Sequence, residues 1–379
     1  MAGPVLEREL TKRPASRVQF DVAGTADDPE IRRLLRENPM AGRISVSLTR
    51  EPNFFADHGV RGETKQTIVA RENGRVVCIG GCTIRQRFVN GQPRRVGYLG
   101  GLRLDARLGG RFDILRRGYE FFRELQTTAP AEFYFTSIAS DNERAQAFLE
   151  RGLPGMPSYE FIGEFVAFLI PAIGRKPVQV RRRDFPERHI GKELVTWLNQ
   201  HNASFQFAPC WSLDELESLQ QLGLQPTDFV VQRQNETIAA AAALWDQRSF
   251  KQAVIQNYAP WLRLFRPIFN ALASVWGGPR LPAPGDTLSN AYISHVTIRP
   301  DQTETLTELI TELCVMAGRR GTEFLTMGFA VNDPRLTVVR RRFRAREYRS
   351  RLYVVRWPGI GGPARELGGG ILAPEVALL

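Results

Sequence analysis

The sequence predicts a mixed α+β fold, in which a largely antiparallel sheet is flanked by helices and two similar domains follow in tandem. Asn73-Gly74 and Asn90-Gly91 each separate two strand-like runs, and this tight-turn signal predicts a three-stranded meander. An Arg/Gly turn at 107–111 then leads into an amphipathic helix. The chain has 379 residues, more than one hydrophobic core usually supports, so two domains are expected.

The first half contains these elements in a defined order. Strand-like apolar runs predict strands, and the apolar spacing after residue 112 predicts a helix. Asn142 and Gly152 are typical start and stop signals for a second, short helix. The expected elements are strands at 67–71, 75–85 and 95–104, a helix from 112, a strand at 132–138, a helix at 142–152 and a closing strand at 159–170.

The turn at 107–111 predicts an anion-binding site. The first N–H groups of a helix have no partner within the helix, and its N-terminus is the positive end of the helix dipole. Gly109 and Gly110 would let a phosphate approach the backbone closely. A pyrophosphate-bearing cofactor fits this chemistry, and a connection that simply requires glycine is the alternative.

The ordered combination resembles the GCN5-related N-acetyltransferase (GNAT) superfamily over residues 17–170. The family turn Arg/Gln-x-x-Gly-x-Gly/Ala is matched from Arg107, except that Phe112 stands at the last small position. The family pattern Asn-x-x-Ala-x-x-Phe/Leu-Leu-x-x-Gly is matched from Asn142 to Gly152. The resemblance implies one acetyl-CoA site. The residues it assigns to that site are Leu102, Arg103, Leu104, Arg107, Gly109, Gly110, Arg111 and Asn142.

The second half repeats the pattern of the first, with an insertion at 261–289 that is rich in Pro and Trp. A helix is expected at 303–319, because Leu306, Leu309, Ile310 and Leu313 share one face. The glycine turn is missing here, and Asp301 and Glu304 would repel a pyrophosphate. We therefore expect a degenerate second copy; the alternative is that any two α+β halves align this loosely. The expected division is a loosely ordered N-terminus at 1–16, domains at 17–170 and 184–357, a linker at 171–183 and a loosely ordered C-terminal tail at 358–379.

The catalytic residues are less clearly marked than the cofactor site. Amine acetylation needs a base for the amine and an acid for the departing thiolate. In the family that the chain resembles, a Tyr beyond the Asn-led helix often serves as the acid, which implies Tyr159. Glu164 and Asp57 are the candidate bases. Packing of Tyr159 on the closing strand is the alternative role.

The charge and composition of the chain indicate which classes of binding partner to expect. The net charge is +11, and nine arginines lie between Arg335 and Arg356 against the single acidic residue Glu347. A solvated face or a dock for a phosphate-rich ligand is favoured over nucleic-acid recognition, because the aromatic stacking pattern of single-strand binders is missing. We expect no membrane partner, because no apolar run approaches the ~20 residues of a membrane span. A cytoplasmic location is expected, because residues 1–9 lack an apolar signal core.

The cysteines and histidines do not predict a metal or a disulfide framework. Cys78 and Cys82 fall on one face of a strand, about 13 Å apart, which is too far to share one ion. The four histidines show no ligand spacing, and His295 is expected to be a buried structural residue.

The predicted function is transfer of an acetyl group from acetyl-CoA to a primary amine of a small molecule or peptide. A non-catalytic acyl-CoA-binding module is one alternative. An aminoacyl-tRNA-dependent transferase, related to the enzymes that build peptidoglycan bridges, is the other.

Overall fold

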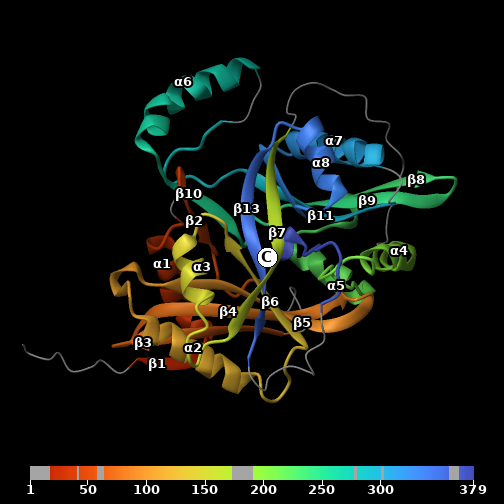
Figure 1. Cartoon of the computed structure of the whole chain (residues 1–379). Helices are drawn as coiled ribbons and strands as arrows, with labels where there is room; N and C mark the ends of the chain where they lie inside the picture. Colours follow the sequence, from red (N-terminus) through yellow and green to blue (C-terminus); the bar gives the residue numbers. More distant parts are fainter. Residues whose placement is uncertain are drawn as a thin grey trace, which may run out of the picture.

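The computed structural model describes residues 18–40, 42–57, 64–172, 191–276, 280–299, 303–357 and 367–379 (Figure 1). The strands are β1 (Gln19–Val22), β2 (Ile44–Thr49), β3 (Thr64–Glu72), β4 (Arg75–Val89), β5 (Gln92–Leu104), β6 (Phe133–Ala139), β7 (Ser158–Pro171), β8 (Phe229–Gln234), β9 (Thr237–Trp245), β10 (Gln252–Tyr258), β11 (Asn290–Ile298), β12 (Phe324–Ala330) and β13 (Arg346–Arg356). The helices are α1 (Asp28–Glu37), α2 (Phe112–Leu125), α3 (Glu143–Leu149), α4 (Lys192–Asn202), α5 (Leu213–Ser218), α6 (Pro260–Trp276), α7 (Thr303–Arg319) and α8 (Pro334–Arg342). The expected N-terminus 1–16 and most of the expected linker lie outside the described residues.

Eleven strands form one continuous sheet in the order β1-β3-β4-β5-β6-β13-β7-β12-β11-β9-β8, and β10 pairs with β2 in a separate two-stranded sheet. Most neighbours are antiparallel; β5–β6 and β11–β12 are parallel. Helices flank the sheet (Figure 1). The predicted fold class is therefore confirmed. None of the described helices is both long enough and apolar enough to cross a membrane.

The two halves exchange their last strands. β13 comes from the end of the chain, yet it pairs with β6 on one side and β7 on the other. β7 ends the first half and pairs with β12 of the second half from Phe165 to Pro171. Two strands of opposite origin therefore run side by side at the centre of the sheet (Figure 1). Neither half can close its own part of the sheet without the other.

The turns and the long helix of the second half follow the sequence closely. Asn73 and Gly74 have φ of 53° and 78°, and Asn90 and Gly91 have φ of 52° and 76°, so both hairpins use the positive-φ turns that Asn-Gly favours. α7 spans the predicted residues 303–319, and all four of its predicted core side chains are fully buried. Both predictions are confirmed.

Each half contains a pair of parallel strands that diverge and a bulge beside the divergence. β5 pairs with β6 only from Val96 to Leu99, and β11 pairs with β12 only from Asn290 to Tyr292. Further along, β5 advances three residues from Gly100 to Arg103 while β4 advances two. β11 does the same against β9 between Ser294 and Thr297. An extra residue of this kind bends a strand and leaves backbone groups outside the ladder.

The C-terminal residues from 367 are packed into the protein, which corrects the expectation of a loosely ordered tail. The backbone of Gln206 donates to Ile371 O at 2.9 Å and accepts from Ala373 N at 2.8 Å. Leu372 and Leu378 are each only 5% exposed. Leu372 belongs to a core cluster with strands of both halves, so this segment helps to hold the halves together.

His295 occupies the bulge of β11 at a φ of 57°, as the buried histidine that the sequence predicted. Its backbone N–H donates to Glu375 Oε2 at 2.8 Å, and its ring stacks on Trp211 at 4.3 Å. Burial, together with a smaller contribution from the Arg85 cation, lowers the pKa of His295 to about 3. Burial raises the pKa of the Glu375 carboxyl. The C-terminal segment thus supplies the acceptor for the bulge of the second half.

We expect the free energy of unfolding to fall as pH drops below 6.5 because of His295. The unfolded chain protonates this ring near pH 6.5, whereas the folded chain resists protonation down to about pH 3. The unfolded state therefore binds more protons in that window, with a slope of up to ~1.4 kcal/mol per pH unit. Urea unfolding of the wild type and of His295→Gln between pH 5 and 7 measures the difference. Because burial raises the pKa of Glu375, the titration of this carboxyl changes the free energy of unfolding with pH in the opposite direction. Glu375 is present in both proteins, so its effect is common to both curves. Parallel curves would contradict a neutral, buried His295.

Truncation of Leu372 tests the C-terminal packing. Leu372→Ala should lower the free energy of unfolding by about 2–5 kcal/mol, because it opens a cavity in the shared core. Leu264→Ala is the matched control, since Leu264 is 73% exposed and should change stability by about 0.5 kcal/mol or less. Equal, small effects in urea unfolding would show that the segment does not pack in solution.

Candidate functional site

The divergence of β5 from β6 creates a gap in the first half. The last shared contacts are the hydrogen bond from Thr136 Oγ1 to Leu99 O at 2.7 Å and the Tyr98–Ser137 hydroxyl pair at 3.3 Å. Beyond this point β5 follows β4, and β6 follows β13. The edge of β5 that faced β6 is therefore no longer paired with β6 beyond Leu99. The bulge lies in this part of β5, where Gly101 has a φ of 68°. Such an edge can donate hydrogen bonds to a bound carbonyl.

The Arg/Gly turn lies at the end of this edge and opens α2. Gly110 has a φ of 95°, and a Cβ built there would meet no heavy atom within 4 Å. α2 begins at Phe112 with Arg111 as its N-cap residue, and no side chain caps it. The turn therefore combines open space, a backbone conformation that favours glycine and an uncapped helix N-terminus. These are the features of an anion cradle.

The arginines of the turn are held by neighbouring carboxylates. Arg107 donates to Asp105 Oδ1 and Oδ2 at 2.9 and 2.6 Å. Arg111 donates to Asp113 Oδ1 and Oδ2 at 2.8 and 2.9 Å, and lies 3.6 Å from Glu72. The hydrogen bonds from Arg107 lower the pKa of Asp105, and those from Arg111 lower the pKa of Asp113. Both guanidinium groups remain accessible to solvent, so an anion could exchange with these carboxylates.

The acidic partners of the two arginines were missed by the sequence analysis. In each case the carboxylate is two residues from the arginine it holds, at Asp105-x-Arg107 and Arg111-x-Asp113. That spacing was the available signal.

The remaining predicted cofactor residues lie on β5 and at the start of α3. Leu102 is partly exposed on β5, Leu104 packs against the core below, and Arg103 Nη1 donates to Leu102 O at 2.8 Å. Burial lowers the pKa of Arg103. Asn142 is the N-cap of α3, and its Oδ1 accepts from Ala145 N at 3.2 Å. A contact of Asn142 with a cofactor stays a prediction.

Phe112, the departure from the family turn, has a packing role. Its ring stacks on Phe148 of α3, with centroids 4.6 Å apart and planes at 18°. This contact ties the start of α2 to α3. The aromatic side chain is thus directed to the neighbouring helix, and the backbone at Gly110 stays open.

The predicted acid and bases lie in three different environments. The Tyr159 hydroxyl pairs with the Tyr119 hydroxyl at 2.5 Å inside an aromatic cluster, and burial raises its pKa well above 10. Asp57 is buried in ion pairs with Arg50 and Lys65, a structural arrangement. Glu164 is partly exposed on β7, 3.6 Å from Arg349. The catalytic roles of Tyr159 and Glu164 stay predictions.

Glu164 lies in the same cross-strand row as Ile138 of β6, two residues beyond the last β6 residue that pairs with β5. Ile138 of β6 lies opposite Arg351 of β13, and Arg351 lies opposite Glu164 of β7. Two strand spacings of about 4.8 Å therefore separate Glu164 from β6. Arg351 Nη1 donates to Gln146 Oε1 of α3 at 3.1 Å, so this row lies on the face that α3 covers.

The second half has a different arrangement at its divergence. Its bulge is occupied by His295, whose N–H is bonded to Glu375, and η5 (Val376–Leu378) contacts both β11 and β12. Asp301, predicted to repel phosphate, lies outside the described residues. Among the residues that the structure describes, no group of three or more His, Cys, Asp or Glu side chains is arranged to hold a metal.

No protein-family model and no curated protein matches the chain. Solved structures do match along nearly its whole length. A GCN5-related N-acetyltransferase from Sphaerobacter thermophilus has a TM-score of 0.54 at 14% identity, covering 92% of this chain and 98% of that one. Saccharomyces cerevisiae N-myristoyltransferase with bound myristoyl-CoA has a TM-score of 0.57 at 11% identity, covering 97% and 91%. The chain therefore has the fold of the GNAT superfamily of acyltransferases.

Proposed function

We propose that the protein is an N-acyltransferase that moves an acyl group from a CoA thioester to an amine, with acetyl-CoA as the donor. The proposal is supported mainly by three features that occur together in the first half. The β5–β6 divergence, the bulge at Gly101 and the open turn at Gly110 follow one another along a single stretch of backbone.

The residues of this stretch suit the parts of CoA. The backbone at Gly110 and the start of α2 would receive the pyrophosphate, whereas the Gly109 N–H already donates to Ala106 O at 3.2 Å. Arg107 and Arg111 would exchange their carboxylate partners for phosphate oxygens. The edge of β5 near Gly101 would hydrogen-bond the thioester carbonyl and stabilise the negative charge that develops on it. One site is proposed, because the second half bonds its own bulge to Glu375.

We propose Glu164 as the base that takes the proton of the amine, directly or through water. Support comes from its partial exposure and from its place in the row that runs through Ile138. Arg349 lies beside it, with Nη1 3.6 Å from Glu164 Oε2. The acceptor is a small-molecule or peptide amine.

A non-catalytic acyl-CoA-binding module is the second candidate. The observation that favours it is the hydroxyl of Tyr159, which is bonded to Tyr119 within an aromatic cluster. The two candidates differ in turnover. Release of free CoA thiol from acetyl-CoA in the presence of an amine panel supports the enzyme, and tight binding without release supports the module.

Gly110→Asp should abolish acetyl-CoA binding. The change puts a carboxylate where the pyrophosphate is proposed to lie and forces an L side chain into a φ of 95°. Titration calorimetry measures it, with Gly285→Asp as the matched control, since Gly285 has a φ of 92° and equally open surroundings. Unchanged binding in Gly110→Asp would refute the site. The same titration with longer acyl-CoA thioesters tests the acetyl preference.

Glu164→Gln should lower kcat by about 100-fold or more, with KM for acetyl-CoA little changed, because the base is removed and the cofactor site is left intact. Glu160→Gln is the control: Glu160 lies on the same strand and is also paired with an arginine, Arg356, at 3.2 Å. Equal kcat values for the two variants would exclude Glu164 as the base.

A further inference from the structure

α6 exposes an apolar surface of unusual size. Its 17 residues include seven large apolar side chains that are 42–80% exposed. Their spacing of three and four residues places them on one side of the helix. We call this surface the α6 apolar face; it consists of Trp261, Leu264, Phe265, Ile268, Phe269, Leu272 and Val275. Figure 1 shows α6 standing apart from the sheet, at the upper edge of the molecule.

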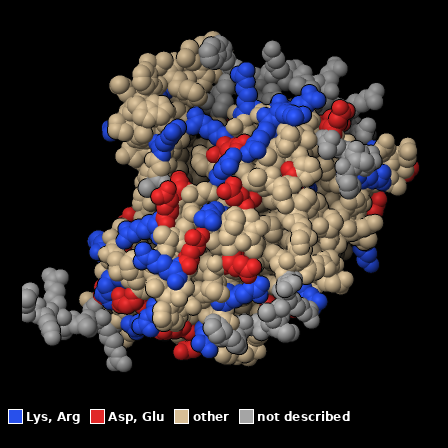
Figure 2. All heavy atoms as spheres, in the orientation of Figure 1, with Lys and Arg blue, Asp and Glu red and all other residues tan. Residues whose placement is uncertain are grey.

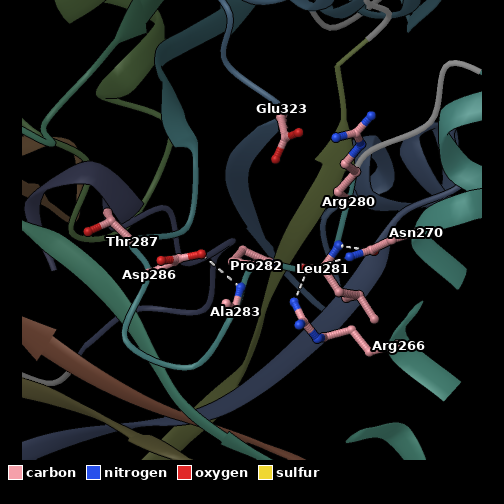
Figure 3. Close-up of a pocket in the computed structure, with 9 residues that line it drawn as sticks. All are labelled: Arg266, Asn270, Arg280, Leu281, Pro282, Ala283, Asp286, Thr287 and Glu323. Atoms are coloured by element: carbon pink, nitrogen blue, oxygen red, sulfur yellow. Dashed lines mark hydrogen bonds between the residues drawn. The ribbon is translucent and has the colours of Figure 1, made fainter. Parts of the chain in front are cut away.

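The polar side of α6 is turned toward the protein. Asn270 exchanges two hydrogen bonds with the backbone of Leu281, at 2.9 and 2.8 Å, and Arg266 donates to Leu281 O at 3.2 Å (Figure 3). Leu262 and Ala273 supply the buried apolar contacts of the helix. A helix that only covered a core would have the opposite orientation. Within the part of the chain that the structure describes, the α6 apolar face is left uncovered.

The charges on α6 itself have one sign, whereas Asp286 and Glu323 line the pocket on its protein-facing side together with Arg266 and Arg280 (Figure 3). The helix contains Arg263 and Arg266 and no acidic residue, and Arg280 follows. Figure 2 shows Lys and Arg side chains gathered on the face below α6, over the upper ends of β13 and α8. That region includes exposed arginines for which the described residues supply no acidic partner: Arg341, Arg342, Arg344 and Arg346. A partner with an apolar interior and an anionic surface would complement both features.

We propose that α6 binds the surface of an anionic lipid bilayer. The α6 apolar face would enter the boundary between headgroups and acyl chains, Trp261 would lie at the level of the headgroups, and the arginines would attract anionic lipid. The helix is about 26 Å long and carries two charges, so it would lie in the interface and not cross the bilayer. This binding is independent of the proposed acyl transfer. It departs from the expectation of no membrane partner, which rested only on the lack of an apolar run long enough to span a bilayer.

A second copy of the chain explains the charges less well. Two copies of α6 packed face to face would bring together helices with arginines and no carboxylates. An anionic bilayer balances the same arginines. The test therefore includes self-association through α6 as a result that would contradict the proposal.

The test is co-flotation of the full chain with vesicles, made either of phosphatidylcholine alone or of phosphatidylcholine mixed with phosphatidylglycerol. We expect binding to the mixed vesicles, weakening as salt rises, and binding at least 10-fold weaker to phosphatidylcholine alone. The double variant Leu264→Glu and Ile268→Glu should weaken binding to the mixed vesicles at least 10-fold. Leu153→Glu with Val331→Glu, two exposed apolar residues outside α6, should leave binding unchanged.

Tryptophan quenching by brominated lipid gives a second readout. Trp197, Trp211, Trp245 and Trp357 are at most 9% exposed, whereas Trp261 of α6 is 55% exposed and open to quenching. Quenching that decreases in Trp261→Phe supports the proposal. No vesicle binding, equal binding to both vesicle types, or a dimer in sedimentation equilibrium that the double variant dissociates would each overturn it. Acetyl-CoA titration of the double variant should match the wild type, so failure of the acyl-transfer proposal would be seen separately.

Discussion

The exchange of β7 and β13 is the constraint on which the rest of the structure depends. β13 pairs with β6 beyond the point where β5 diverges from it, and β7 pairs with β13 on one side and with β12 on the other. Without this exchange, the backbone edges at the centre of the sheet would be left without partners, which is costly in a buried strand. The exchange also brings Glu164, from the first half, beside Arg349 and Arg351 of the second. The surface next to the proposed site is therefore composite.

The same backbone feature occurs in both halves, but its surroundings differ between them. Both contain diverging parallel strands and a one-residue bulge. In the first half the bulge contains Gly101, and a glycine turn opens the next helix. In the second half the bulge contains His295, whose N–H is bonded to Glu375 from the C-terminal segment. A bulge whose donor already has an internal acceptor stabilises the fold, and one whose edge stays open can bind a ligand.

α6 shows that amphipathicity must be judged with the orientation of the helix. Its apolar residues recur at helical spacing, which in isolation is typical of a helix that covers a core. The hydrogen bonds of Asn270 and Arg266 to Leu281 instead fix the polar side against the protein. The helix itself also lacks acidic residues, which is the basis for proposing an anionic partner. The insertion thus adds an exposed apolar surface, and it follows directly on β10, which pairs with β2 of the first half.

The sequence by itself determined the local elements: the Asn-Gly hairpins, the Asn142 cap, the buried face of α7 and the turn at Gly110. Each depends on a few neighbouring residues and on φ preferences or periodicity, which a single chain displays directly. Only the tertiary structure decided the exchange of β7 and β13, the packing of the C-terminal segment, the pairing of Tyr159 with Tyr119 and the outward orientation of α6. These depend on contacts between residues far apart in the chain, and strand-like or apolar patterns do not specify which distant partner will bury them.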